Sequence, residues 1–348
     1  MKDKLKFGLV GAGSIAQAYA QAFGTSDTAR LVAVADLRTN AARALAEGVG
    51  CRGYGAYQDM ADAETDLDAV VVCTPPVTHP EISVYFLERK VHVLCEKPLS
   101  IDTANARMML DKAKENDVTL TMATKFRYVE DVVRAKSIVT SGILGEIVLF
   151  ENAFTSRVDM STRWNSNPAI SGGGVLIDNG THSVDLMRYF LGPLADVQVV
   201  EGKRSQGLAV EETVHIFVRS TSGVMGAIDL SWSINKELDS FLNIYGSQGS
   251  VSVGWRESKY RQSSSRDWIV FGKGYDKVEA FRSQIDNFSR ALAGEEPLLV
   301  SAEDALASVE VVEAAYEALR ENRWTTVNGD GFDATHHESP IIEARNIV

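Results

Sequence analysis

The chain has 348 residues, enough for about two domains, and its 45% hydrophobic and 24% charged residues are typical of a packed globular protein. Its formal charge of -12, with 47 acidic against 35 basic residues, disfavours nucleic acid and anionic membranes as partners, and we expect neither. The 3 cysteines form no C-x-x-C pair, which excludes a disulfide framework and a thiolate zinc site and favours a reducing cytoplasm.

Short apolar runs alternate with helix-favouring segments from residue 6 to about residue 122. Strands are expected at KFGLV (6–10), RLVAVA (30–35), AVVVC (69–73), VHVLC (91–95) and VTLTMA (118–123). Helices are expected between them, at residues 15–23, 40–48, 80–90 and 103–116. This alternation predicts an α/β domain, residues 1–124, with a doubly wound parallel (Rossmann) sheet covered on both faces. Gly11, Gly13 and Gln17 interrupt the apolar run at residues 7–20, so we do not expect a signal peptide there.

Beyond about residue 145, alternating runs are separated by turns. Strands are expected at residues 146–154, 195–202, 213–220, 224–233, 240–247 and 250–254. Turn signals at residues 221–223 and 246–249 predict hairpins, so residues 125–327 should form an α+β domain with a large open, mostly antiparallel sheet. Helices are expected at residues 277–292 and 302–320, the second with Ser301 and Asp304 as a capping box. Residues 328–348 are polar and without a period, and we expect a C-terminal tail.

The turn between the first strand and the first helix reads GAGSIA, residues 11–16. This is the G-x-G-x-x-G/A pattern of dinucleotide-binding proteins, and it lies between a strand and a helix as that pattern requires. Gly11 permits the tight turn, Gly13 lets the backbone approach a pyrophosphate, and Ala16 allows close helix packing. Ser14 and Ile15 complete the turn, so this segment predicts NAD, with NADP possible, at the helix N-terminus.

Asp36 stands at the carboxyl end of the second strand, where the adenosine ribose lies in a doubly wound sheet. Its carboxylate favours NAD over NADP. A helix cap for the segment that starts near Thr39 is the alternative. Arg38 keeps NADP open because a guanidinium can hold a 2′-phosphate.

The order of motifs from about residue 4 to residue 327 resembles the Gfo/Idh/MocA oxidoreductase family. GAGSIA is followed by Asp36, by Thr74-Pro75-Pro76 with His79, by Glu96-Lys97-Pro98, and by GGGVLIDNGTHSVD at residues 172–185. The resemblance implies redox chemistry on sugars or cyclitols and a cis bond before Pro98. It also implies a homodimer or homotetramer that assembles through the free face of the open sheet.

Five residues of these motifs are candidates for cofactor contact beyond the glycine turn: Thr74, Pro75, His79, Glu96 and Lys97. Thr74 and Pro75 should line the nicotinamide side of the site. At the next position this chain has Pro76, where the family more often has Asn. For His79, a cofactor contact and a structural role at a helix start are equally open. Glu96 is expected beside the cofactor, where it would orient Lys97.

Three residues are the catalytic candidates. Lys97 lies just past a predicted strand, at the carboxyl edge where ligands bind, and its ammonium can stabilise a developing alkoxide. Asp178 and His182 are four residues apart on one expected helix face, where imidazole can take the proton of a carbinol with a carboxylate beside it. No third ligand at metal spacing accompanies this pair, so we expect no metal site.

The substrate-binding candidates come from three segments. Arg127 and Tyr128 resemble the substrate-facing pair of the family, and Arg157, Arg163 and Trp164 lie on a loop able to close over the site. From the glycine-rich segment we add Asp178, Asn179 and His182.

The leading hypothesis is an NAD(P)-dependent dehydrogenase that transfers a hydride between nicotinamide and a secondary alcohol of a sugar, cyclitol or sugar derivative. Two alternatives stem from the same resemblance: a glycoside hydrolase that retains its NAD, and a non-catalytic regulator that senses the dinucleotide. The presence of both Lys97 and His182 argues against the regulator.

Overall fold

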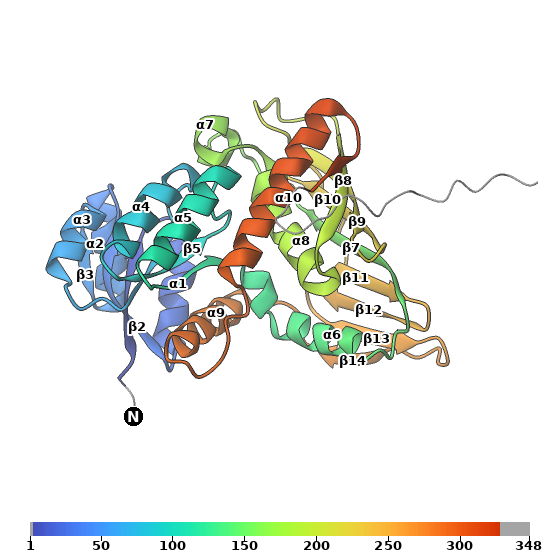
Figure 1. Cartoon of the computed structure of the whole chain (residues 1–348), viewed down its shortest axis with the longest axis horizontal. Coiled ribbons are helices and arrows are strands. Elements are labelled where there is room, and N and C mark those ends of the chain that lie inside the picture. Colours follow the sequence, from blue (N-terminus) through green and yellow to red (C-terminus); the bar gives the residue numbers. More distant parts are fainter. Residues whose placement is uncertain (1–2, 328–348) are drawn as a thin grey trace, which may run out of the picture.

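Two sheets lie side by side in the computed structural model, each with helices packed against it (Figure 1). The structure describes residues 3–327, so the expected tail, residues 328–348, lies outside the described residues. Within residues 3–327, no helix is both long and apolar enough to cross a membrane.

The first sheet contains 6 strands within the described residues, in the order β3-β2-β1-β4-β5-β6 of a dinucleotide-binding Rossmann fold. All neighbouring pairs run parallel. The strands are β1 (Leu5–Val10), β2 (Ala29–Ala35), β3 (Arg52–Tyr54), β4 (Ala69–Val72), β5 (His92–Glu96) and β6 (Leu120–Ala123). The helices are α1 (Ser14–Thr25), α2 (Thr39–Val49), α3 (Tyr57–Ala63), α4 (His79–Leu87) and α5 (Thr103–Glu115). The predicted doubly wound sheet is confirmed.

Every strand predicted from a continuous apolar run is present in this sheet. Val70, Val71 and Val72 of β4 are fully buried, as expected for a parallel strand covered on both faces. The sequence does not predict β3 or α3. β3 has three residues at the sheet edge and begins with the exposed Arg52, so no apolar run marks it.

The second sheet has the order β14-β13-β12-β11-β7-β10-β9-β8-β15 within the described residues. Its pairs are antiparallel except β10 with β7, which agrees with the predicted mostly antiparallel sheet. The strands are β7 (Ile147–Thr155), β8 (Leu194–Glu201), β9 (Thr213–Ser220), β10 (Met225–Ser231), β11 (Ser240–Gly246), β12 (Gly249–Gly254), β13 (Ser258–Gln262), β14 (Ile269–Gly272) and β15 (Thr325–Thr326). The sequence does not predict β13, β14 or β15.

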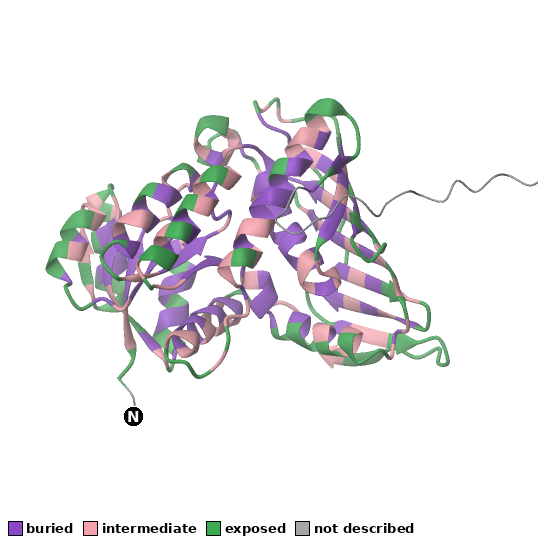
Figure 2. Ribbon diagram, in the orientation of Figure 1, coloured by how far each residue is buried: buried purple, intermediate pink, exposed green. Residues whose placement is uncertain are grey.

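Within residues 3–327, helices cover one face of the second sheet and leave the other open (Figure 1). The helices of this half are α6 (Glu130–Thr140), α7 (Pro168–Ser171), α8 (Val175–Leu191) and α10 (Ala302–Glu321). Inward residues such as Ile216 and Ile228 pack in one core with Leu176 of α8. Apolar residues stay exposed on outward positions, among them Val148, Val200, Phe217, Met225 and Tyr245. The alternation of buried and exposed colours along these strands is visible in Figure 2.

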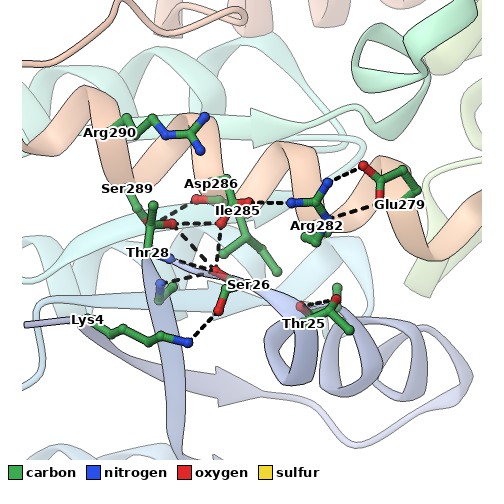
Figure 3. A network of polar contacts seen from close by, with 12 residues as sticks. Lys4, Thr25, Ser26, Thr28, Glu279, Arg282, Ile285, Asp286, Ser289 and Arg290 are labelled. Atoms are coloured by element: carbon green, nitrogen blue, oxygen red, sulfur yellow. Dashed lines mark hydrogen bonds and ion pairs between the residues drawn. The ribbon is translucent and has the colours of Figure 1, made fainter. Parts of the chain in front are cut away.

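α9 (Lys277–Leu292) follows the second sheet in the chain but packs against the first domain (Figures 1 and 3). Its Phe281 and Phe288 share a core with Phe7. Asp286 on the same helix accepts hydrogen bonds from Ser26 Oγ at 2.6 Å and Thr28 Oγ1 at 2.7 Å. The predicted domain boundary at residue 124 stays a prediction. α9 lies after this boundary in the sequence but packs against elements that come before it.

Candidate functional site

A cavity of about 850 Å³ opens at the carboxyl ends of β1, β2, β4 and β5, and the second domain forms its far wall. This is where a doubly wound sheet binds ligands. The predicted residues that line it are Gly11, Gly13, Ser14, Ile15, Asp36, Arg38, Thr74, Pro75, Glu96, Lys97, Arg163, Trp164 and Asp178. Lining residues that the sequence did not single out include Tyr57, Gln58, Lys125 and Asn165.

The glycine turn has the conformation that a pyrophosphate needs. Gly11 has φ +104°, and a Cβ there would lie 2.8 Å from the carbonyl oxygen of Cys73. At Gly13, which caps α1, a Cβ would meet no described atom within 4 Å, so the backbone faces open space. The first turn of α1 carries no acidic side chain and no side-chain cap, which leaves its N–H groups for an anion. Ala16 is fully buried and packs behind the turn instead of lining the cavity.

Asp36 is held at the end of β2 by backbone N–H groups. Its carboxylate accepts from Ala12 N and Arg38 N, both at 2.7 Å, and Arg38 Nε lies 3.4 Å away. Burial alone would raise the pKa of Asp36, but these hydrogen bonds hold it below its usual value. No cap hydrogen bond from a side chain is present at the start of α2, so the alternative of a helix cap finds no support. The carboxylate is fixed and ionised at the place expected for the adenosine ribose.

His79 is fully buried and does not line the cavity. Its Nε2 lies 2.8 Å from the carbonyl oxygen of Thr74 and its Nδ1 lies 2.9 Å from that of Pro98. The imidazole therefore ties the loop after β4 to the loop after β5. Its position favours the structural alternative, and the peptide bond between Lys97 and Pro98 is cis, as the resemblance implied.

Glu96 is buried beneath the site. Its carboxylate accepts from Tyr19 OH at 2.8 Å and from the backbone N of Lys97 at 3.1 Å. Burial raises the pKa of Glu96, although the charges of Lys125 and Lys97 oppose that rise. Glu96 thus fixes the backbone at Lys97, while its carboxylate makes no hydrogen bond to the Lys97 ammonium.

The Lys97 ammonium reaches across the cavity to α8 in the second domain. It donates to the Asp178 carboxylate at 2.5 Å and to the Asp178 carbonyl oxygen at 2.9 Å. Asp178 was expected to orient His182, one helical turn further on. In the structure, its carboxylate is engaged by Lys97, which joins the two domains at the site.

The start of α8 explains why Asp178 lies at this wall. Glu211 accepts from the N–H groups of Gly174 and Leu176, at 2.8 and 3.1 Å, and so caps the helix from another segment. A Cβ on Gly174 would lie 2.1 Å from the Glu211 carbonyl oxygen. The glycine run is therefore needed for this close approach, and the cap could not be read from the local sequence.

His182 is 5% exposed and is not among the residues that line the cavity. Its Nε2 lies 3.4 Å from the Nζ atom of Lys125, and within the described residues its Nδ1 has no hydrogen-bond partner. Burial and the positive charges of Lys125 and Lys97 hold the pKa of His182 well below its usual value. The imidazole is neutral at physiological pH.

Arg127 and Tyr128 point into the protein. The Arg127 guanidinium pairs with Asp185 at 2.8 Å and with Asp304 at 3.0 Å, and it is 2% exposed. Tyr128 OH donates to Asn287 at 3.2 Å. Neither residue lines the cavity, so substrate contact by this pair stays a prediction that these contacts do not support.

The loop before α7 contributes to the cavity in part. Arg163, Trp164 and Asn165, at the start of η3 (Trp164–Ser166), line it, and Trp164 is 43% exposed. Arg157 is exposed and Asn179 is half-buried on α8, and neither lines the cavity. Within residues 3–327, no group of three or more His, Cys, Asp or Glu side chains is placed to share a metal ion.

Comparison with known proteins assigns both halves of the chain. Residues 5–124 match the family described as "Oxidoreductase family, NAD-binding Rossmann fold", and residues 132–252 match the "GFO/IDH/MocA C-terminal domain". The chain belongs to the Gfo/Idh/MocA oxidoreductase family. NAD is therefore the cofactor of its first domain, and the glycine turn, the open helix N-terminus and Asp36 fit it.

Two curated dehydrogenases and one solved structure show how far the similarity extends. Inositol 2-dehydrogenase of Rhizobium meliloti is 27% identical over 343 residues, covering 93% of this chain and 99% of the relative. D-glucoside 3-dehydrogenase of Escherichia coli is 34% identical over 191 residues, 54% of each chain. The structure titled levoglucosan dehydrogenase in complex with NADH and levoglucosan has a TM-score of 0.86 at 22% identity, covering 94% of this chain and all of that one, and it shows the shared fold.

Proposed function

We propose that this Gfo/Idh/MocA protein is a cytoplasmic dehydrogenase that transfers a hydride between NAD and a secondary alcohol of a sugar, cyclitol or sugar derivative. The observation that carries the proposal is the Lys97–Asp178 pair, because it places an ammonium in the wall of the dinucleotide cavity. The names of the relatives, an inositol and a glucoside dehydrogenase among them, support this substrate class.

Bound NAD supplies the hydride acceptor, and the chain's own residues supply position and charge. The Lys97 ammonium donates a hydrogen bond to the carbinol oxygen and stabilises the charge that develops there. Asp178 holds that ammonium in place, and Glu96 fixes the backbone beneath it. The hydroxyl proton leaves toward Lys125 and His182, whose Nζ and Nε2 atoms lie 3.4 Å apart.

The lining of the cavity suits a polyhydroxylated substrate. Asp178, Arg163 and Asn165 offer hydrogen-bonding groups, and the half-exposed Trp164 can stack on a sugar face. The two cationic groups Lys97 and Arg163 also suit a carboxylate or phosphate on the ring. We therefore place sugar acids and phosphorylated sugars beside plain sugars and cyclitols in the substrate class.

The subunits of this enzyme should assemble as a homodimer or homotetramer. The exposed apolar side chains on the open sheet, including Phe217 and Met225, form the surface that this assembly would bury.

The deciding experiment incubates the purified protein with NAD or NADP and a panel of sugars, cyclitols, sugar acids and simple alcohols, and follows nicotinamide absorbance. Turnover of polyols with formation of one reduced nicotinamide per product supports the proposal. Efficient turnover confined to simple aliphatic or aromatic alcohols would contradict the substrate class. Glycoside cleavage without net reduction of added NAD would instead identify an NAD-retaining hydrolase.

A further inference from the structure

Residues 156–167, which we call the substrate loop, carry Arg163, Trp164 and Asn165 to the wall of the cavity. The loop leaves the second sheet after β7 and ends at α7, which lies against η1 (Pro76–Thr78) of the first domain. It therefore connects the parts of the cavity wall that the two domains contribute. Every substrate contact proposed for these three side chains depends on where the loop is held.

The tip of the substrate loop, residues 161–166, is bonded mainly to itself. Ser161 Oγ donates to the Asp159 carboxylate and Ser166 Oγ donates to the Arg163 carbonyl oxygen, both at 2.7 Å. Within residues 3–327, no hydrogen bond from a side chain of the tip reaches outside the loop. The position of the tip therefore depends on how the two ends of the loop are fixed.

The first end of the substrate loop is held by the side-chain amide of Gln206. The Met160 side chain is 3% exposed, in the core of the second domain, and its backbone N–H donates to Oε1 of Gln206 at 3.0 Å. Nε2 of the same amide donates to the Val158 carbonyl oxygen at 3.0 Å. One side chain thus binds the loop through an acceptor and a donor, at two positions along it.

The same amide joins the substrate loop to the second sheet. Nε2 of Gln206 lies 3.1 Å from the Trp232 carbonyl oxygen and 3.1 Å from Ser233 Oγ, both just after β10. A glutamine amide has two N–H donors and one carbonyl oxygen, so all of its hydrogen-bonding groups are engaged here. An apolar side chain of the same size would make none of these bonds.

Gln206 is itself fixed by a buried carboxylate. Glu212 is 0% exposed and accepts hydrogen bonds from the backbone N–H groups of Ser205, Gln206 and Leu208, at 2.8, 2.9 and 3.2 Å, and from Ser233 Oγ at 2.7 Å. Burial alone would raise the pKa of Glu212, but these hydrogen bonds lower it to about 2. The ionised carboxylate therefore sets the backbone from which Gln206 reaches the loop.

We propose that Gln206 is the positioning residue of the substrate loop and that it thereby sets the affinity for the substrate. Gln206 does not line the cavity, so it acts through the loop and touches no reactant. This inference rests on the proposed function, because Arg163 and Trp164 can meet a polyhydroxylated ring only while the loop is held. Lys97 and Asp178 bond each other without this anchor, so loss of the Gln206 amide should weaken substrate binding and spare the chemical step.

The first test needs no turnover. Cleavage by trypsin after Arg163 is followed by mass spectrometry in wild type, Gln206→Met and Gln262→Met. Gln262 is the matched control, because its amide also donates to a main-chain carbonyl oxygen, that of Ile143 at 3.5 Å, and it does not line the cavity.

The cleavage rate should follow the population of the locally opened loop. In Gln206→Met, cleavage after Arg163 should be about tenfold faster, the scale for losing one or two hydrogen bonds, and in Gln262→Met it should not change. Equal rates in the two variants would overturn the proposal. Faster cleavage throughout the chain in Gln206→Met would also overturn it, since that result would mean a general loss of stability.

The second test uses rates with the substrate found for the proposed function. Gln206→Met should raise KM for that substrate by about tenfold, while kcat and the Kd for NAD stay within about twofold of wild type. Ser233→Ala removes one partner of the same amide and should raise KM by less, so it stays informative should Gln206→Met fail to fold. An unchanged KM, or a fall in kcat in its place, would refute the positioning role.

Trp164→Ala shows whether Gln206 acts through the substrate loop. This variant should raise KM by itself, and the addition of Gln206→Met should then raise KM little further, because the contact that Gln206 positions is already gone. Fully additive effects of the two substitutions would show that Gln206 acts elsewhere and would refute the proposal. If no member of the substrate panel is turned over, the proposed function fails, while the trypsin rates still decide whether Gln206 holds the loop.

Discussion

The two walls of the cavity are built in different ways. The cofactor-facing wall consists of backbone: Gly11 in a left-handed conformation, Gly13 open to the cavity, and Asp36 fixed by two N–H groups. The substrate-facing wall consists of charged side chains, Lys97, Lys125 and Asp178, which come from both domains.

This difference explains how each wall can be recognised and how each should respond to substitution. Backbone geometry follows from a few consecutive residues, so GAGSIA alone indicates a dinucleotide. The chemistry of the opposite wall depends on which side chains meet after folding. Substitutions on the substrate-facing side should therefore split into those that remove a reacting group and those that remove its support, whereas substitutions on the cofactor-facing side should change binding.

Arg127→Met should have the largest effect, and it should act on stability. Arg127 is the charge partner of Asp185, which is 0% exposed, and removal of one partner from a buried ion pair costs about 3–5 kcal/mol. We expect that loss in the free energy of unfolding, measured in urea. Arg163→Met is the control, because Arg163 is exposed at the cavity. If the Arg127→Met protein is as stable as wild type but has a raised KM for the substrate, Arg127 is a substrate-binding residue as the sequence predicted.

Lys97→Met should be next, and it should act on chemistry. Dinucleotide binding should stay nearly intact, while kcat should fall by about 10² or more, the scale for one group that stabilises developing charge. Calorimetry with NAD and steady-state kinetics measure the two effects separately. Turnover within about threefold of wild type would make the Lys97–Asp178 pair a link between domains and nothing more.

Asp36→Asn should have a smaller effect, and on the cofactor side alone. The carboxylate of Asp36 opposes a 2′-phosphate, so its loss should shift the ratio of the NAD and NADP dissociation constants toward NADP by about tenfold, or about 1.4 kcal/mol. Arg38→Met in the same background should reverse part of that gain. An unchanged ratio would show that Asp36 does not decide between the two dinucleotides.

Deletion after Val327 should have the smallest effect. The glycine turn and Asp36 belong to the first domain, and the contacts that hold them come from Ala12, Arg38 and Cys73. The Kd for NAD should therefore stay within a factor of about two, a few tenths of a kcal/mol. A truncated protein that folds but no longer binds NAD would contradict this prediction and show that residues 328–348 contribute to NAD binding.

The sequence was sufficient for features set by local rules. Continuous apolar runs predicted β1, β2, β4, β5 and β6, and alternation with turn signals predicted β7 to β12. The helix cap at Ser301 is also confirmed, since its side chain accepts from Asp304 N, whereas within the described residues the Asp304 carboxylate pairs with Arg127 and not with the Ser301 backbone. Elements without a hydrophobic period were missed: β3 and β15 are very short, and β14 is largely exposed.

The site could be predicted only where a residue's position in the chain fixes its position in space. Lys97 was placed correctly at the carboxyl edge of the sheet because it directly follows β5. The same rule applies to Lys125 after β6, and it would have found that residue had it been applied to every strand. Arg127 shows the limit, because its partners Asp185 and Asp304 lie 58 and 177 residues further along the chain.

The return of α9 to the first domain bears on how the chain acquires its structure during synthesis. Ser26 and Asp286, which hydrogen-bond each other, are separated by 260 residues. A ribosome that has released residues 1–124 has therefore not yet released Phe281 and Phe288, which complete the core beside Phe7. The first domain emerges early but must keep an apolar surface uncovered until nearly the whole chain has been made, which is a period of exposure to chaperones and to aggregation.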